Sequence, residues 1–119
     1  VKDLGGNVML YALAGSKMVD AGRHLGLTVV QEVFADRSYQ DDGTLRPRSL
    51  PGALIEDEAT AIARAMDMVE TGQVVSHGGN RIDVSAETIC LHGDQPGALR
   101  FATALRHACA LRGITVASP

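Results

Sequence analysis

The chain has 119 residues, 45% of them hydrophobic, with 11 basic and 14 acidic side chains and a formal net charge of −3. This length allows one modest hydrophobic core, so we expect a single domain over residues 1–119. The acidic balance lacks the basic surface that binding to nucleic-acid phosphates needs. No apolar run approaches the roughly 20 residues that span a bilayer, and no signal peptide opens the sequence. Cys90 and Cys109 form no Cys-x-x-Cys pair. A reducing, cytoplasmic setting without nucleic-acid or membrane partners fits best.

The first part of the chain predicts a strand, a helix and a second strand. Residues 8–13 are a continuous apolar run, which indicates a strand buried on both faces. A helix is expected from Ser16, as its N-cap, to Leu25, with Gly26 ending it. Its apolar stripe consists of Met18, Ala21 and Leu25. A strand over 28–35 completes a βαβ unit, which implies parallel pairing with a right-handed crossover.

Residues 36–53 are a long segment without periodicity, with a tight turn at Asp42-Gly43. Loops of this length are uncommon in compact domains and tend to be functional. A helix capped by Asp57 then runs to about Glu70 and stops at Gly72. Its stripe consists of Ile62, Met66 and Val69. Residues 74–83 predict a small hairpin around Gly78-Gly79-Asn80, which is a turn and not a phosphate loop because no helix follows it.

The last third predicts a third buried strand at 88–91, a helix opened by Pro96 and stopped by Gly113, and a short strand at 114–116. One face of that helix is apolar: Ala98, Phe101, Ala102, Leu105, Ala108 and Cys109. Residues 1–4 resemble the last turn of a helix that precedes a strand, so the chain is expected to begin in mid-fold. Four strands alternating with three helices make about half of a (β/α) barrel of roughly 250 residues.

Two groups of polar residues follow predicted strands, where parallel α/β proteins bind their ligands. Glu32 and Asp36, four residues apart with Arg37 next to them, suit acid/base chemistry, metal ligation or the clamping of an anion. A structural ion pair at a strand end explains them equally well. His92 can act as a general base, while Asp94 can bond that histidine or cap the next helix.

The helix after Asp94 offers backbone N–H groups to an anion, although a packed histidine and a capping aspartate would explain the same residues. In the long loop, Arg46, Arg48 and Ser49 could hold a phosphate or carboxylate, with solvated charge as the alternative. The other histidines predict no function: His24, His77 and His107.

Taken in order, several short motifs resemble the LamB/YcsF family, to which the A subunit of the bacterial 5-oxoprolinase belongs. They are Leu13-Ala14-Gly15-Ser16, Glu32-Val33-Phe34-Ala35-Asp36-Arg37, Asp42-Gly43-Thr44-Leu45, Pro47-Arg48-Ser49, Gly52-Ala53 and Cys90-Leu91-His92-Gly93-Asp94. Each motif alone is ordinary, but the ordered set covers nearly the whole chain. The family's N-terminal motifs, with an acidic opening, an HxGD-type and a KPHG-type segment, have no counterpart here.

The resemblance implies the C-terminal half of a distorted TIM-like barrel of the glycoside hydrolase and deacetylase type. It also implies ATP-dependent opening of 5-oxoproline to L-glutamate, with ATP and Mg²⁺ as co-substrate, two partner subunits, and the missing N-terminal half of the same protein. This chain alone is then expected to be inactive. Glu32, Asp36 or His92 would position or deprotonate water, and Arg37 and Arg48 would hold the substrate carboxylate or a phosphate.

Two other functions remain open. One is a metal-dependent hydrolase acting on carbohydrate, because barrels of this type use Asp/His metal sites. The other is a non-catalytic subunit that binds a small anion or supports a partner at the same strand ends.

Overall fold

The computed structural model describes residues 1–94 and 96–119 and has an α/β architecture with a parallel sheet. Its elements in chain order are the 3-10 helix η1 (Lys2–Leu4), β1 (Met9–Leu13), α1 (Lys17–His24), β2 (Thr28–Phe34), α2 (Glu58–Thr71), β3 (Gln73–Val75), β4 (Arg81–Asp83), β5 (Thr88–Cys90) and α3 (Ala98–Leu111). Among the described residues, no helix combines the length and the apolar character needed to cross a bilayer.

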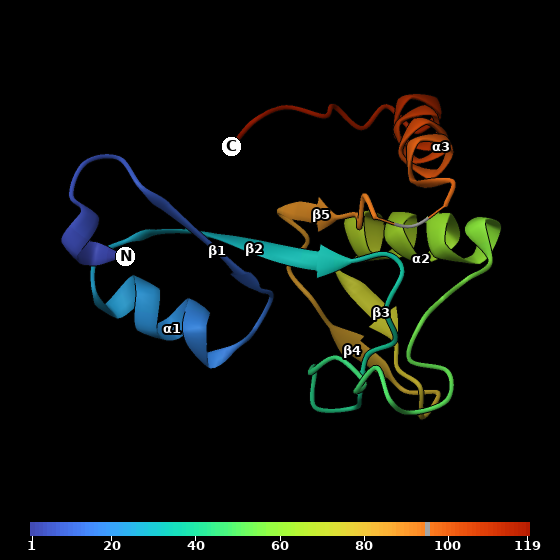
Figure 1. Cartoon of the computed structure of the whole chain (residues 1–119), viewed down its shortest axis with the longest axis horizontal. Helices are drawn as coiled ribbons and strands as arrows, with labels where there is room; N and C mark the ends of the chain where they lie inside the picture. Colours follow the sequence, from blue (N-terminus) through green and yellow to red (C-terminus); the bar gives the residue numbers. More distant parts are fainter. Residues whose placement is uncertain (95) are drawn as a thin grey trace.

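The main sheet has the order β1-β2-β5 and all its pairs are parallel (Figure 1). Leu13 lies opposite Glu32, which in turn lies opposite Thr88, and Phe34 lies opposite Cys90. The parallel pairing across α1 confirms the predicted βαβ unit, and β5 is the predicted third strand. Because the strands are parallel, the ends of β2 and β5 lie side by side.

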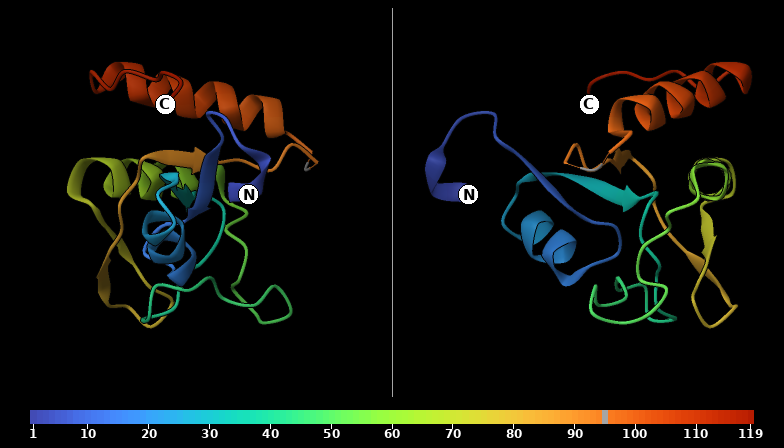
Figure 2. Two further views of the ribbon diagram at one scale, coloured as in Figure 1. Left: turned by 90° about the vertical axis from the view of Figure 1, so that its left-hand side faces the viewer. Right: turned by 45° about the vertical axis from the view of Figure 1, so that its right-hand side comes forward.

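Strands β3 and β4 form the predicted antiparallel hairpin, which lies below α2 in Figure 1 and is seen from two further sides in Figure 2. The hairpin and the sheet share one buried cluster of side chains, made of Ala14, Val33, Tyr39, Met68, Val74 and Val84. This cluster fixes the long loop, through Tyr39, to the same core as the sheet.

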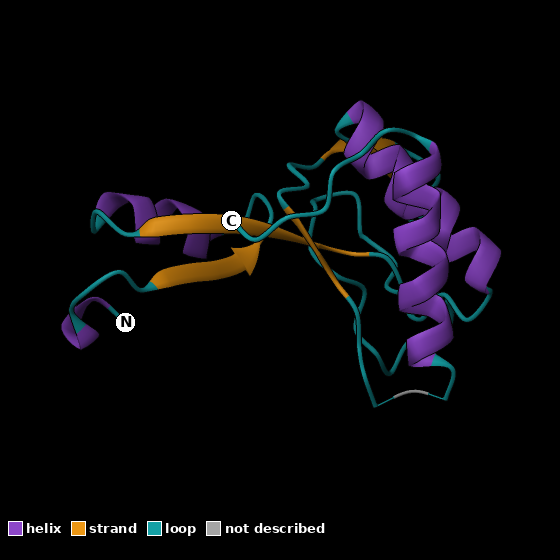
Figure 3. Cartoon of the chain, turned by 90° about the horizontal axis from the view of Figure 1, so that it is seen from above, coloured by secondary structure: helices purple, strands orange, loops and turns teal. Residues whose placement is uncertain are grey.

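Helix α2 has the ends that its sequence predicts. Asp57 is its N-cap, and the carboxylate accepts a hydrogen bond from the Thr60 N–H at 2.9 Å. Gly72 ends the helix in the left-handed conformation, with φ of 67°. Figure 3 shows α2 and α3 together, away from α1. They share a second buried cluster, made of Ala35, Ala65, Met66, Leu105 and Cys109.

The predicted apolar stripe of α1 is wrong. Met18 and Leu25 are 58% and 48% exposed, and the buried residues of the helix are Val19 and Gly22. A Cβ atom at Gly22 would lie 2.7 Å from the Leu10 Cδ2 atom, so the helix approaches the sheet at the residue without a side chain. Periodicity counts side chains and therefore misses a glycine as a contact residue.

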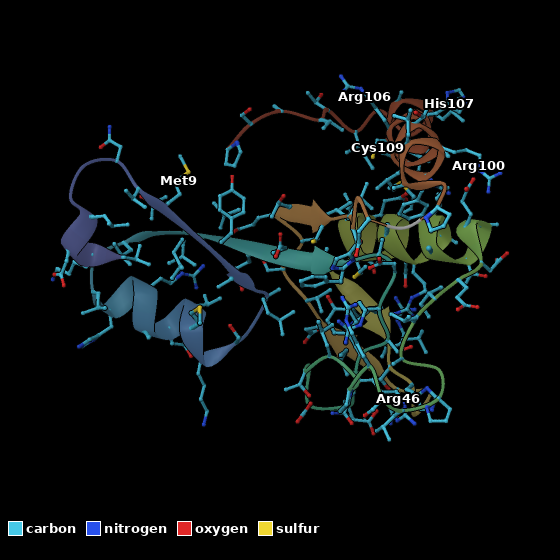
Figure 4. All side chains as sticks on the ribbon, viewed as in Figure 1. Met9, Arg46, Arg100, Arg106, His107 and Cys109 are labelled. Atoms are coloured by element: carbon cyan, nitrogen blue, oxygen red, sulfur yellow. The ribbon has the colours of Figure 1, made fainter. Side chains whose placement is uncertain are left out.

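Strand β1 is not buried on both faces, contrary to the sequence prediction. Met9 and Tyr11 are 41% and 45% exposed, while Ala12 on the other face is buried. Since residues alternate between the faces, Leu10 and Ala12 face α1, and Met9 and Tyr11 face the side without a helix. Figure 4 shows Met9 pointing away from α1. The apolar run therefore forms a strand with one face, that of Met9 and Tyr11, open to solvent.

The predicted strand over 114–116 is also wrong, because that segment forms no ladder with any described strand. Instead, the Ile114 N–H donates to the Cys109 carbonyl at 2.9 Å and the Ile114 side chain packs against the cluster between α2 and α3. A strand needs a neighbour that supplies hydrogen bonds. In this segment the Cys109 carbonyl of α3, and not a neighbouring strand, accepts the Ile114 hydrogen bond.

The long loop over 36–53 is more ordered than its sequence suggests. The Ser38 N–H donates to the Ala53 carbonyl at 2.9 Å, and Tyr39 pairs with Leu45 in an antiparallel bridge. The expected turn at Asp42-Gly43 is confirmed, with Gly43 at φ of 85°. These bonds fold the loop back on itself, and Arg48 in its later part comes within 3.5 Å of His92.

Candidate functional site

An aspartate and a histidine meet where β2 and β5 end. Asp36 lies in the turn after β2, and His92 lies two residues beyond β5. The Nδ1 atom of His92 is 2.8 Å from the Oδ2 atom of Asp36, and both side chains are about three-quarters buried. The two segments are 56 positions apart in sequence, and the parallel pairing of β2 with β5 brings them together.

The second nitrogen of His92 faces a guanidinium. The Nη2 atom of Arg48 is 3.5 Å from Nε2. Arginine has only donors, so in the neutral ring Nε2 is the acceptor and Nδ1 carries the proton that it donates to Asp36. The Phe34 ring stacks on the imidazole, with centroids 6.0 Å apart and planes at 24°. The ring is therefore held by a carboxylate and an aromatic face, with its basic nitrogen directed at Arg48.

Glu32 lies on β2 two residues before Phe34, and Phe34 is the register partner of Cys90 on β5. Burial raises the pKa of the Cys90 thiol most, followed by the charges of Glu32 and Asp36 and a hydrogen bond to Glu32. The raised pKa favours the protonated thiol. Sequence reasoning treated Cys90 as a buried strand residue; the signal that places it at the site is its register opposite Phe34.

A cleft of about 370 Å³ opens in front of the Asp36–His92 pair. Its charged lining residues are Asp36, Arg48, Glu56, Glu58, His92 and Arg100. The first turn of α3 also borders it, through Gly97 and Ala98. Arg100 is engaged by Glu58, with its Nε atom 3.0 Å from a carboxylate oxygen. Sequence reasoning missed Arg100 and Glu58, since a helical pattern alone does not show which surface residues border a cleft.

Two of the predicted arginines donate to backbone carbonyls of the loop and do not line this cleft. Arg37 is buried and donates to the Arg46 carbonyl at 2.8 Å. Arg46 donates from its Nε atom to the Pro51 carbonyl at 2.7 Å. Both guanidiniums therefore stabilise the turn that carries Arg48. The alternative explanation, a structural ion pair of Arg37 with Glu32 or Asp36, is not among the salt bridges of the described residues.

Ser49 and Asp94 are exposed and lie outside the lining of the cleft. Neither expected role of Asp94 is observed. The N-cap of α3 is Gly97, which makes no side-chain capping bond, and the partner of the His92 Nδ1 atom is Asp36. Glu32 and Asp36 do not share one strand, because β2 ends at Phe34 and Asp36 reaches His92 from the following turn.

The arrangement is suited to proton transfer next to an anion. A neutral imidazole held by a carboxylate is a general base, and a guanidinium beside a helix N-terminus attracts a carboxylate or phosphate. Among residues 1–94 and 96–119, no group of three His, Cys, Asp or Glu side chains is placed to hold a metal ion.

Comparison with known proteins finds sequence similarity along the whole chain. The LamB/YcsF family matches residues 1–119. The chain is 51% identical to the 5-oxoprolinase A subunit of Heliobacterium modesticaldum and 48% identical to that of Bordetella parapertussis, in each case over 98% of this chain and 46% of the relative. It thus spans about half the length of the relatives it matches.

A solved structure matches the fold of this chain over nearly its whole length. The crystal structure of a lactam utilization protein from Thermus thermophilus superposes with a TM-score of 0.87 and 37% sequence identity, covering 97% of this chain and 45% of that one. The fold and the ordered motifs thus agree with one family along the whole sequence. The chain belongs to the LamB/YcsF family.

Proposed function

We propose that this chain is part of an ATP-dependent 5-oxoprolinase, which opens the lactam of 5-oxoproline to L-glutamate together with partner subunits. The names of its relatives support the substrate, and the observation that carries the proposal is the Asp36–His92 pair, joined at 2.8 Å beside the cleft that Arg48 enters. We further propose that the three parallel strands are the C-terminal half of a TIM-like barrel, which the other half of the polypeptide completes.

The chemistry explains why a base and an anion site are both needed. Amide resonance makes a lactam a poor electrophile, and phosphorylation of its oxygen by ATP would activate the ring carbon towards water. The Nε2 atom of His92 takes one proton from the attacking water while the new C–O bond forms. The ring C–N bond then breaks as the imidazolium returns its proton to the leaving nitrogen, and a second water hydrolyses the resulting acyl phosphate to L-glutamate and inorganic phosphate. Asp36 stabilises the imidazolium that forms.

The remaining residues have supporting roles in this proposal. Arg48 holds the substrate carboxylate or a phosphate at the mouth of the cleft, next to the first turn of α3. The negative charge of Glu32 helps to raise the pKa of Cys90 and so to keep this thiol protonated. Arg37 acts through the loop, because its guanidinium supports the Arg46 carbonyl and not the cleft.

Replacement of the proposed base tests this function. In the full-length protein with its partner subunits, His92→Ala should lower 5-oxoproline-dependent turnover at least about 100-fold, and Asp36→Ala should produce a loss of similar size. His24→Ala is the matched control, since His24 is exposed at the end of α1. Near-normal turnover in the His92 variant, with the fold intact by circular dichroism, would exclude the base role.

The dependence on ATP needs its own measurement. Release of inorganic phosphate and of glutamate should rise together when 5-oxoproline is added to the complete assembly. Glutamate formation that continues unchanged without ATP would contradict the ATP-dependent mechanism, even if the His92 result holds.

A further inference from the structure

We propose that Arg48 caps the basic nitrogen of His92 and releases it when an anionic group of the substrate binds the guanidinium. This inference rests on the proposed function, because it describes how the same site is switched on. It makes Arg48 a gate as well as a binding residue, so that the base becomes more reactive when a carboxylate or phosphate is in place.

The two sides of the His92 ring are held very differently. The Nδ1 atom is fixed by Asp36 at 2.8 Å, and Phe34 stacks on the ring. The Nε2 atom has only the Arg48 contact at 3.5 Å, which is long for a hydrogen bond. Any rearrangement at this site therefore starts with Arg48 and leaves the imidazole in place.

Arg48 differs from its neighbours in what it binds. Arg100 is paired with Glu58, and Arg46 donates to the Pro51 carbonyl. Within the part of the chain that the structure describes, no Asp or Glu oxygen lies within 4 Å of the Arg48 guanidinium. Arg48 is also exposed. Its charge is thus available to an anion in the cleft.

A carboxylate is a stronger partner for a guanidinium than an imidazole nitrogen. It can accept two parallel charge-assisted bonds, whereas Nε2 accepts one long bond. The first turn of α3, which borders the same cleft, adds backbone N–H groups on the side of the anion. Binding of the anion therefore draws Arg48 away from Nε2 and leaves the lone pair free for water.

The capping contact is exposed to solvent, so its effect is modest. Exposed charged contacts contribute little to stability, and we expect the cap to slow reactions of Nε2 by about 2- to 5-fold. This is enough to favour substrates that carry an acidic group over neutral lactams, in addition to the affinity that Arg48 provides directly.

Carbethoxylation of His92 by diethyl pyrocarbonate tests the gate without depending on turnover. The rate is measured by peptide mass spectrometry in the full-length protein at about pH 8, where an ordinary imidazole is neutral. Arg48→Met keeps the apolar stem and removes the donor, so His92 should react about 2- to 5-fold faster than in the wild type. Arg100→Met, which changes the same cleft without touching His92, should react at the wild-type rate.

Acetate supplies the anion. It should accelerate carbethoxylation of His92 in the wild type and leave the rate of the Arg48→Met variant unchanged. An equal rate in the wild type and the Arg48→Met variant, or no acceleration by acetate, would overturn the gate. Failure of the intact assembly to open 5-oxoproline would overturn the proposed function instead, whatever the carbethoxylation rates are.

Discussion

The two ends of this molecule are built differently. Around the ends of β2 and β5, the loop, the hairpin, α2 and α3 enclose two buried clusters and fix Asp36, His92 and Phe34 in place. At the other end, α1 contacts the sheet through Val19 and Gly22, and β1 leaves Met9 and Tyr11 exposed. Tight packing is concentrated where the proposed chemistry needs fixed side chains.

The largest expected contrast comes from one pair of methionines. Met68 is fully buried in the cluster between α2, the hairpin and the sheet, and Met18 is 58% exposed on α1. Met68→Ala should lower the free energy of unfolding of the full-length protein by about 3 kcal/mol, because it removes buried volume from a packed core. Met18→Ala should change it by less than about 0.5 kcal/mol. Chemical denaturation measures both, and equal losses would remove the contrast between the two ends.

Much of the fold follows from the sequence because its signals are local. The Asp57 cap, the left-handed glycines at Gly26 and Gly72 and the parallel βαβ unit all depend on neighbouring residues, and all are confirmed. The failures depend on what lies across space. Only the structure shows that α1 packs through Gly22 and that residues 114–116 have no neighbouring strand.

At the candidate site too, local signals predict the positions of residues along the chain but not their contacts across space. Position after a strand predicts that Asp36 and His92 lie at one edge of the sheet, and the structure joins them. The structure also distinguishes three arginines: Arg48 reaches the cleft, whereas Arg37 and Arg46 donate to carbonyls of the loop. These three guanidiniums look alike in a sequence. The partners of Arg37 and Arg46 are backbone carbonyls that the folding of the loop brings close.

A thiol tests the electrostatics at the site end. The negative charge of Glu32 helps to raise the pKa of Cys90, so its removal should lower that pKa and increase the thiolate fraction at a given pH. Below the pKa, Glu32→Gln should therefore speed alkylation of Cys90 by iodoacetamide about 3- to 10-fold. Glu56→Gln is the control, because Glu56 lines the cleft but is not among the charges that raise the Cys90 pKa. Equal rates in the two variants would place Glu32 away from the thiol.

A smaller effect tests the packing of α1. A Cβ atom at residue 22 would lie 2.7 Å from Leu10 Cδ2 and 2.8 Å from Val29 Cγ2. Overpacking costs about 1–3 kcal/mol, which exceeds the gain of up to about 1 kcal/mol from alanine in a helix. Gly22→Ala should thus lower the free energy of unfolding by about 1 kcal/mol, and Ala21→Ser on the exposed side should be close to neutral. An increase in stability would mean that α1 does not touch the sheet at this point.

The smallest expected effect concerns the helix that begins beside the cleft. Hydrogen bonds from the Thr60 hydroxyl and N–H hold the pKa of Asp57 below its usual value of 3.8. Because the folded-state pKa is the lower one, the stabilisation is fully present above the unfolded value and is lost as the pH falls through the folded one. Asp57→Ala should therefore lower the melting temperature at pH 7 and have a shrinking effect below about pH 4. Thermal unfolding of wild type and variant across that range measures the difference, and a difference independent of pH would mean that the cap stabilises α2 without its charge.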